Sequence, residues 1–326
     1  MPNIHRSKNV VVIGLIALAL NLTGCLHYGH YGTRINPSPE PPKPNSIDSD
    51  YFHAGTAPVA PKLLSDRKRD GYSIQKFRFQ THTAFLYLPD QVRTAPAVIL
   101  LPITQGDYYT KQMAHLLSEN GFIALRFQSH GHLLTTRNSK DALTEFELLL
   151  KEDVMDVLEG IDWLAGRPFV DHDRIGIVGI SMGAVIGSVV SGLDSRIRAG
   201  VFILGGGDLS GILFSSKEPN IVAIRKRIEE EEDLTRDELI AETGRRLRNV
   251  DPLTYADHLD PNRVFMINAY FDHVIKRRYG MALWEAIGEP PMVMLPTGHY
   301  SASMFFDYAQ TRMMAHFRKV FGLEKK

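Results

Sequence analysis

From about residue 97 the chain alternates between short, continuous apolar runs and longer segments in which apolar residues recur every three or four positions. Continuous apolar runs are typical of strands buried on both faces, as in a parallel sheet covered by helices. The intervening spacing indicates the covering helices. The runs predicted to be strands are 97–101, 122–127, 174–180, 199–204, 264–269 and 292–295. The segments predicted to be helices are 108–120, 141–165, 182–192, 275–287 and 301–320.

Two further strands are predicted at the start of the domain. Residues 74–79 and 83–88 are separated by a short polar turn and form an antiparallel entry hairpin. Strands that alternate with helices favour a mostly parallel, doubly wound sheet with helices on both faces. The predicted fold class is therefore α/β, and a domain of 63–326 is large enough for one sizeable core.

One segment interrupts the alternation. Residues 208–250, after the sixth predicted strand, are highly charged and carry enough spaced apolar residues for short helices. Thr144 with Glu147 predicts a capping box near the start of helix 141–165, and Thr235 with Glu238 predicts an N-cap within the insert. The insert is either a lid over a site or a solvated helical excursion, and both interpretations stay open.

The first 25 residues have the pattern of an export signal. Two basic residues precede an apolar run at 10–20, which is too short for a comfortable membrane span. The segment Leu22-Thr23-Gly24-Cys25 resembles the lipobox of bacterial lipoproteins. The resemblance implies that 1–24 is a signal peptide and that Cys25 is lipidated. An ordinary secretory signal with a chance cysteine is the alternative.

The composition limits the partners. Cys25 is the single cysteine, so no intrachain disulfide can form, and the formal net charge of zero gives no reason to expect nucleic-acid binding. Residues 25–62 are rich in proline and predict an extended tether. Leu26 follows the cysteine, which by resemblance to Gram-negative lipoproteins implies the outer membrane if the source is Gram-negative. We therefore expect a lipid-anchored protein of the cell envelope.

The strongest chemical signal is Gly179-Ile180-Ser181-Met182-Gly183. This G-x-S-x-G pattern has a predicted strand directly before it and a small-residue helix directly after it, which is the context that a nucleophile elbow requires. The sharp turn exposes the serine hydroxyl, and the helix N-terminus favours negative charge. Ser181 is therefore the candidate nucleophile.

A serine hydroxyl is a weak nucleophile until a base removes its proton. His299 is the favoured base, because it follows the last predicted strand in a loop with Gly298. Asp272, just after strand 264–269, is the favoured acid, with Asp208 after strand 199–204 as the competing one. The other histidines weighed as bases are His258, His273 and His316.

The negative oxygen of an acyl-transfer transition state needs two N–H donors. Met182, directly after the nucleophile, is one candidate. The other comes from the loop after strand 97–101, with Ile103 as first choice and Thr104 as second. His130 and His132 could be considered a metal pair, but no cysteine or carboxylate cluster accompanies them, so no metal site is expected.

The order of strands, the elbow and the succession Ser181, Asp272, His299 resemble the α/β-hydrolase superfamily over about residues 72–322. The local sequence patterns around these motifs are similar to those of the branch that contains dienelactone hydrolases, acyl esterases and prolyl-oligopeptidase-like enzymes. The resemblance implies that Phe271-Asp272-His273-Val274 carries the triad acid, and that the insert lies where such hydrolases often carry a lid. The loop at Ile103 departs from the commoner His-Gly pattern, which leaves the second oxyanion donor open.

These features predict a serine hydrolase that cleaves a carboxylic ester or thioester without a cofactor. A peptidase or acyltransferase of the same fold is the alternative within this chemistry. A catalytically inactive binding lipoprotein of the envelope is the alternative from another class.

Overall fold

We describe the chain from a computed structural model over residues 51–52, 60–90, 92–103, 106–129 and 141–324. The predicted signal peptide 1–24, Cys25 and most of the predicted tether lie outside these residues, as do Thr104, His130 and His132.

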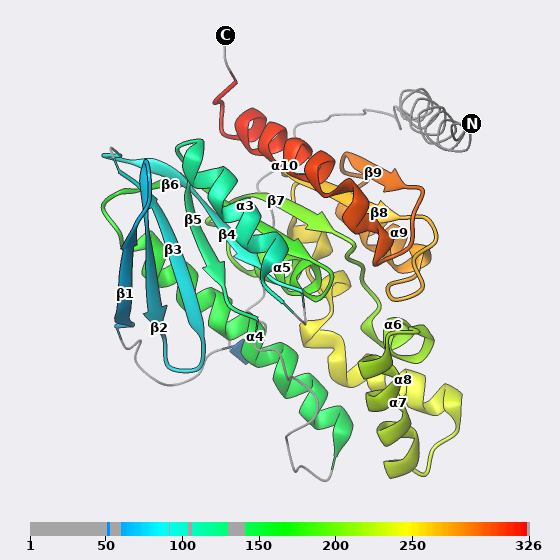
Figure 1. Ribbon diagram of the computed structural model, residues 1–326. Coiled ribbons are helices and arrows are strands. Elements are labelled where there is room, and N and C mark those ends of the chain that lie inside the picture. The colour runs from blue at the N-terminus through cyan, green and yellow to red at the C-terminus, as the bar shows by residue number, and fades with distance from the viewer. Residues whose placement is uncertain (1–50, 53–59, 91, 104–105, 130–140, 325–326) are drawn as a thin grey trace, which may run out of the picture. The chain divides into compact units, whose positions relative to one another are not determined.

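The core of the domain is a nine-stranded sheet with the order β1-β2-β3-β5-β4-β6-β7-β8-β9 (Figure 1). The first three strands pair antiparallel with one another, and β3 pairs antiparallel with β5. All pairs from β5 to β9 are parallel. The strands are β1 Lys62–Lys68, β2 Tyr72–Arg78, β3 Thr83–Pro89, β4 Ala95–Leu101, β5 Ile123–Phe127, β6 Val170–Ile180, β7 Ile197–Ile203, β8 Val264–Ala269 and β9 Met292–Leu295.

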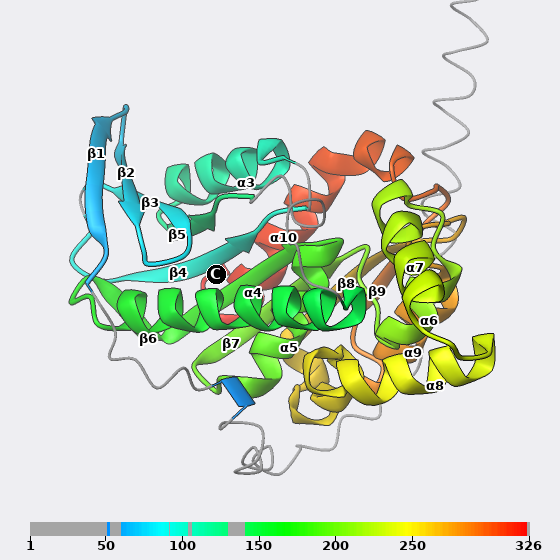
Figure 2. The ribbon, with the colours of Figure 1, turned by 90° about the horizontal axis from the view of Figure 1, so that it is seen from below.

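Helices cover both faces of this sheet (Figure 2). On one face lie α3 (Tyr108–Glu119) and α10 (Phe306–Val320), and on the other lie α4 (Ala142–Ala165), α5 (Met182–Leu193) and α9 (Arg277–Ile287). Val98 and Leu100 of β4 pack on the α3 side, whereas Ile99 and Leu101 pack on the α4 side. Apolar residues on both faces explain why this strand is a continuous apolar run. The predicted mostly parallel sheet between two helical layers is confirmed.

The insert between β7 and β8 is helical. It consists of α6 (Leu209–Ser215), α7 (Pro219–Glu231) and α8 (Arg236–Arg246). Thr235 and Glu238 form the predicted cap of α8, with both arms of a capping box present. Short 3₁₀ turns complete the connections, at Leu247–Val250, Pro252–Thr254, Ala256–His258 and Pro261–Arg263, and Ser301–Phe305 precedes α10.

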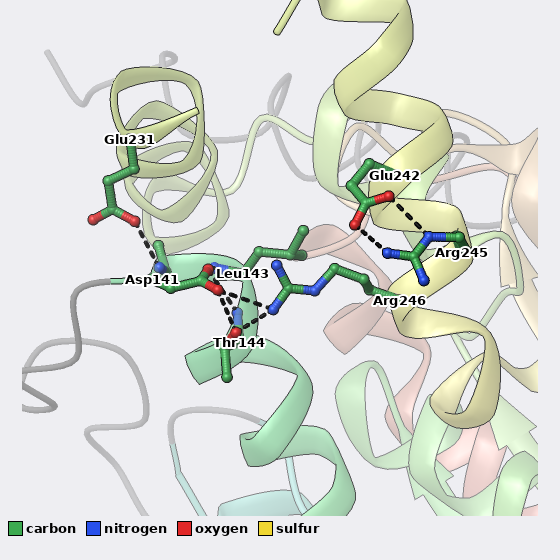
Figure 3. A network of polar contacts seen from close by, with 8 residues as sticks. Asp141, Leu143, Thr144, Glu231, Glu242, Arg245 and Arg246 are labelled. Carbon is green, nitrogen blue, oxygen red and sulfur yellow. Dashed lines mark hydrogen bonds and ion pairs between the residues drawn. The ribbon is translucent and has the colours of Figure 1, made fainter. Parts of the chain in front are cut away.

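The insert is attached to the start of α4 (Figure 3). Arg246 of α8 donates to Asp141 Oδ2 at 3.1 Å and also contacts the Thr144 hydroxyl. Glu231 Oε2 at the end of α7 accepts a 2.6 Å hydrogen bond from the N–H of Ala142. Arg227 and Glu145 add a 3.1 Å ion pair between the same two helices. The insert therefore packs on the domain rather than extending into solvent.

The structure corrects the expected N-cap of α4. The N-cap is Asp141, whose Oδ1 accepts from the N–H groups of Leu143 and Thr144, both at 3.0 Å. The predicted pair Thr144 and Glu147 is not the cap, because Thr144 lies inside the first turn and hydrogen-bonds to Asp141.

Two features at the beginning of the domain were not expected from the sequence. β1 is an edge strand whose residues are mostly exposed, so it has no apolar face to reveal it. Phe52, inside the predicted tether 25–62, is buried in the core, and the Tyr51 hydroxyl donates to Glu147 Oε1 at 2.8 Å. The part of the chain that packs thus includes residues before 63. Among the helices described, none combines the length and the apolar character needed to cross a bilayer.

Candidate active site

The residues of the candidate site follow three parallel strands. Ser181 comes directly after β6, Asp272 lies three residues past β8, and His299 follows β9. The carboxyl ends of parallel strands meet at one edge of a sheet, which is where ligands bind in open α/β folds. The fold therefore brings these residues together although 118 positions separate Ser181 from His299.

Ser181 occupies the sharp turn between β6 and α5. Its backbone has φ 56° and ψ −117°, a conformation that side chains rarely adopt. A Cβ on Gly179 would overlap the backbone of Gly183, and a Cβ on Gly183 would lie 2.6 Å from the carbonyl oxygens of both Leu101 and Pro102. Both elbow glycines are therefore required by close backbone approach.

The three side chains form one hydrogen-bonded series. Ser181 Oγ lies 2.9 Å from His299 Nε2, and His299 Nδ1 lies 2.7 Å from Asp272 Oδ2. The side chains of His299 and Asp272 are 9% and 2% exposed, so their contact is shielded from water. In this arrangement the imidazole can take the proton of the serine hydroxyl while the carboxylate fixes its orientation.

The Asp272 carboxylate is held in place by backbone groups. Its Oδ1 accepts from the N–H of Val274 at 2.7 Å and from the N–H of Ile275 at 2.9 Å. The other oxygen is thereby left pointing at His299.

Asp208, the competing acid, occupies a different position. It has a left-handed backbone with φ 63° and is the N-cap of α6, with its Oδ1 accepting from the N–H of Gly211 at 2.9 Å. Its own N–H donates to Asp251, whose pKa is raised by burial. The structure thus gives Asp208 a capping contact and gives Asp272 the contact with histidine.

The remaining histidine candidates lie in other contacts. His258 Nδ1 is 3.1 Å from the carbonyl oxygen of Gly192. His273 is exposed, and its carbonyl accepts from Lys217 of the insert. His316 Nε2 lies 3.0 Å from the carbonyl oxygen of Arg263, and burial lowers the pKa of this imidazole to about 4.

The two candidate oxyanion donors border the same space as Ser181. Met182 is the first residue of α5, where N–H groups have no partner within the helix. The missing side chain of Gly183 lets the loop after β4 approach the first turn of α5. Ile103, in that loop, lines one cavity together with Met182 and Ser181.

That cavity has a volume of about 440 Å³ and is mostly apolar. It extends from Ser181 and His299 between α4, α5 and the insert on one side and α3 and α10 on the other. The apolar residues that line it include Tyr109, Met113, Phe146, Leu149, Val185, Leu209, Ile212, Leu213, Ile221 and Phe306. Glu218 is the carboxylate on its lining, and its side chain caps α7 through the N–H of Ile221.

A buried ion pair supports the loops beside the site. Arg126, at the end of β5, is 4% exposed and lies 3.0 Å from Asp107 Oδ2. Asp107 Oδ1 accepts from the N–H of Ser129 at 2.7 Å, so the start of α3 is joined to the loop after β5. Nothing in the sequence pattern indicated that Asp107 was the partner of Arg126.

Among the described residues, one group could supply metal ligands. His82 Nδ1 lies 3.2 Å from Asp156 Oδ1 and 3.9 Å from Glu159 Oε2. The His82 ring stacks between Phe79 and Phe127, with centroid distances of 4.4 and 4.9 Å. His82 lies in the turn between β2 and β3, and Asp156 and Glu159 lie on α4.

Comparison with known proteins adds two partial sequence matches. Residues 158–249 match the family model described as the C-terminal domain of BAAT and acyl-CoA thioester hydrolases. Esterase FrsA of Photorhabdus laumondii is 30% identical over 146 residues, which cover 41% of this chain and 32% of that protein. The chain thus spans about a third of the length of this relative.

Solved structures match over much more of the chain. Acetyl xylan esterase 1 of Thermoanaerobacterium is 16% identical with a TM-score of 0.65, over 86% of this chain and 95% of that one. An acetyl xylan esterase of Paenibacillus is 15% identical with a TM-score of 0.62, over 84% and 96%. The acylaminoacyl peptidase of Pyrococcus horikoshii is 17% identical with a TM-score of 0.58, over 83% and 43%. The chain has the α/β-hydrolase fold.

The α/β-hydrolase fold explains the position of the elbow. In this fold the G-x-S-x-G serine lies at the top of the sheet, followed along the chain by an acid and then a histidine. Ser181, Asp272 and His299 occur in that order and are in hydrogen-bonding contact here.

Proposed function

We propose that this protein is a serine hydrolase that cleaves a carboxylic ester or thioester through an acyl-enzyme on Ser181. The observation that carries the proposal is the continuous series Asp272, His299, Ser181, with contacts of 2.7 and 2.9 Å, at the edge of an apolar cavity.

The first half of the reaction forms the acyl-enzyme. His299 Nε2 takes the proton from Ser181 Oγ as that oxygen attacks the carbonyl carbon of the substrate. Asp272 holds the imidazole and stabilises the imidazolium that forms. The N–H groups of Met182 and Ile103 are proposed to bind the negative oxygen. His299 then gives its proton to the leaving alcohol or thiol.

The second half releases the acid. His299 takes a proton from a water molecule, and the resulting nucleophile attacks the acyl carbon. The tetrahedral intermediate collapses, and Ser181 Oγ recovers its proton from His299. In both halves of the proposed reaction, the side chains of this chain transfer the protons and its backbone N–H groups bind the negative oxygen.

The sequence matches support ester or thioester cleavage. The region that resembles acyl-CoA thioester hydrolases contains the elbow and most of the insert, and the curated relative is an esterase. The likeness to acylaminoacyl peptidase concerns the fold alone, so it does not favour peptide cleavage.

A fluorophosphonate probe tests the nucleophile. The probe should label the wild-type protein and not Ser181→Ala, and the wild type should turn over p-nitrophenyl acetate. A folded wild-type protein that is neither labelled nor active would contradict the proposal.

We also propose that Cys25 is lipidated and anchors the domain in the cell envelope, at the outer membrane in a Gram-negative source. The lipobox-like Leu22-Thr23-Gly24-Cys25 supports this proposal.

A further inference from the structure

We propose that the cavity beside Ser181 is an acyl-chain pocket, and that the substrates are uncharged esters or thioesters of medium-chain acids with about eight to twelve carbons. This inference rests on the serine hydrolase function proposed above and specifies the acyl group.

The size of the cavity is the first argument. Its volume of about 440 Å³ lies within the range of small-molecule sites. At roughly 30 Å³ per heavy atom, taken from the volume of a water molecule in the liquid, a cavity of about 440 Å³ holds about 15 heavy atoms. An acetyl group would leave most of the cavity without a partner, whereas a medium-chain acyl group fills it.

The chemistry of the walls is the second argument. Phe146 and Leu149 of α4, Val185 of α5 and Leu213 of α6 line the cavity and are each at most 7% exposed. A wall of buried apolar side chains binds a hydrocarbon chain by removing it from water. Glu218 is the carboxylate on the lining, so a negative charge on the acyl group would be repelled.

The position of His299 indicates which part of the substrate lies in the enclosed region. The leaving group receives a proton from His299 and must depart while the acyl group stays bound to Ser181. Tyr300, next to His299, lines the cavity and is 68% exposed, so the exit lies there. The enclosed region between α4, α5 and the insert is thereby left for the acyl chain.

The insert makes part of this pocket. Leu209, Ile212 and Leu213 of α6 and Ile221 of α7 line the cavity. Ile221 is half-buried and lies in the first turn of α7, so its side chain can be enlarged with little disturbance of the core. The insert is thus a specificity element for the acyl group.

The test measures kcat/KM for p-nitrophenyl esters of increasing acyl length, from acetate to palmitate. Burial of each methylene group should raise kcat/KM by about fourfold until the pocket is full. The optimum is expected near octanoate to dodecanoate. Acetate esters of alcohols of increasing length should show no comparable rise.

Two matched variants examine the wall. Ile221→Trp should shift the optimum to shorter chains and reduce the ratio of decanoate to acetate turnover at least about tenfold, which corresponds to a few methylene groups. Ile240→Trp is the control, because Ile240 is also a half-buried isoleucine of the insert but does not line the cavity. Its chain-length profile should match that of the wild type.

The outcomes separate this inference from the proposed function. A protein that is labelled at Ser181 but hydrolyses acetate best, or gains rate only with alcohol length, overturns the acyl pocket and leaves the serine hydrolase standing. Equal profiles for Ile221→Trp and wild type also overturn it. A protein that is neither labelled nor active with any ester fails at the earlier step.

Discussion

Ser181 shows how a strained residue is held in place by its neighbours. A left-handed backbone at a non-glycine residue costs about 1–3 kcal/mol. The N–H of Ser181 donates to the carbonyl of Ile203 at 2.8 Å, and its carbonyl accepts from Ala184 and Val185. These bonds to β7 and α5 fix the turn from both sides, so the hydroxyl is directed at His299 before any substrate binds.

Asp272 and Asp208 offer a direct test of the acid. Asp272→Asn should keep the backbone bonds from Val274 and Ile275 but place an amide beside His299 Nδ1, which disfavours the required tautomer. We expect kcat to fall by roughly 10³- to 10⁴-fold, by analogy with other triads. Steady-state kinetics on a p-nitrophenyl ester measures the loss.

Asp208→Asn is the matched control, because asparagine is also a good N-cap and can accept from Gly211. Turnover should stay within about twofold of wild type, since no reacting group is removed. If Asp208→Asn abolishes turnover in a folded protein while Asp272→Asn does not, the assignment of the acid is wrong.

At the residue scale the sequence predicted the positions that carry local signals. The elbow and the loops after β8 and β9 made Ser181, Asp272 and His299 candidates, because each lies within four residues of the end of a recognisable strand. Asp107 was missed as the partner of Arg126, and Tyr51 as the partner of Glu147. Those contacts join segments that are distant in the chain, and nothing in the local pattern marks them.

The insert is an element whose attachment can be weakened selectively. Arg246 reaches across to Asp141 and Thr144 on α4, whereas Arg245 pairs with Glu242 on its own helix (Figure 3). Burial raises the pKa of Asp141, but hydrogen bonds from Thr144 and Arg246 outweigh this effect and hold the pKa below its ordinary value.

We expect Arg246→Met to lower the free energy of unfolding by about 1 kcal/mol, because it removes charge-assisted bonds between two helices. Urea unfolding measures this change, and limited proteolysis should show faster cleavage within 208–250. Arg245→Met is the control and should change stability by less than about 0.5 kcal/mol. Equal effects of the two substitutions would show that the attachment to α4 is unimportant.

The free energy of unfolding depends on pH through His316 of α10. Burial lowers the pKa of this imidazole from 6.5 to about 4, so the native state keeps it neutral while the unfolded state takes up a proton. The part of the free energy of unfolding that depends on neutral His316 is fully present above pH 6.5 and is lost as the pH falls from 6.5 to 4. Between pH 7 and pH 5 the loss should be about 2 kcal/mol.

His316→Gln should remove this dependence, because the amide is uncharged at both pH values and can still donate to Arg263. The measurement is the free energy of unfolding of both proteins in urea at pH 7 and pH 5. The wild type should lose about 2 kcal/mol more than the variant over this interval. An identical pH dependence of the two would contradict the lowered pKa of His316.

Elements with an apolar signal were predicted well, and elements without one were not. β4 to β9 and the covering helices were found because they bury both faces or one face. β1 (Lys62–Lys68) is an edge strand of mostly charged and exposed residues. Its pairing with β2 depends on backbone hydrogen bonds. The cap of α4 was misplaced because Thr144 and Asp141 are both good capping residues, and they lie only three positions apart, so the local pattern allows either.

At the scale of the whole molecule, the α/β-hydrolase fold accounts for the site, and the N-terminal segment accounts for its proposed location. Cys25→Ser should move the protein from the membrane fraction to the soluble fraction of the cell envelope, because it removes the side chain that is proposed to carry the lipid. Fractionation followed by immunoblotting checks this result, and activity on p-nitrophenyl acetate is the control for folding. Unchanged membrane association of Cys25→Ser would contradict the lipid anchor.

The packing of Tyr51 and Phe52 against α4 limits the distance that the chain can span between Cys25 and the folded domain. From Cys25 to Tyr51 the chain has 51 − 25 = 26 residue steps, which at about 3.5 Å each span at most about 90 Å. The proposed lipid anchor at Cys25 would therefore keep the folded domain within about 90 Å of the membrane surface. At that distance the proposed hydrolase could reach both esters that leave the bilayer and esters dissolved in the layer above it.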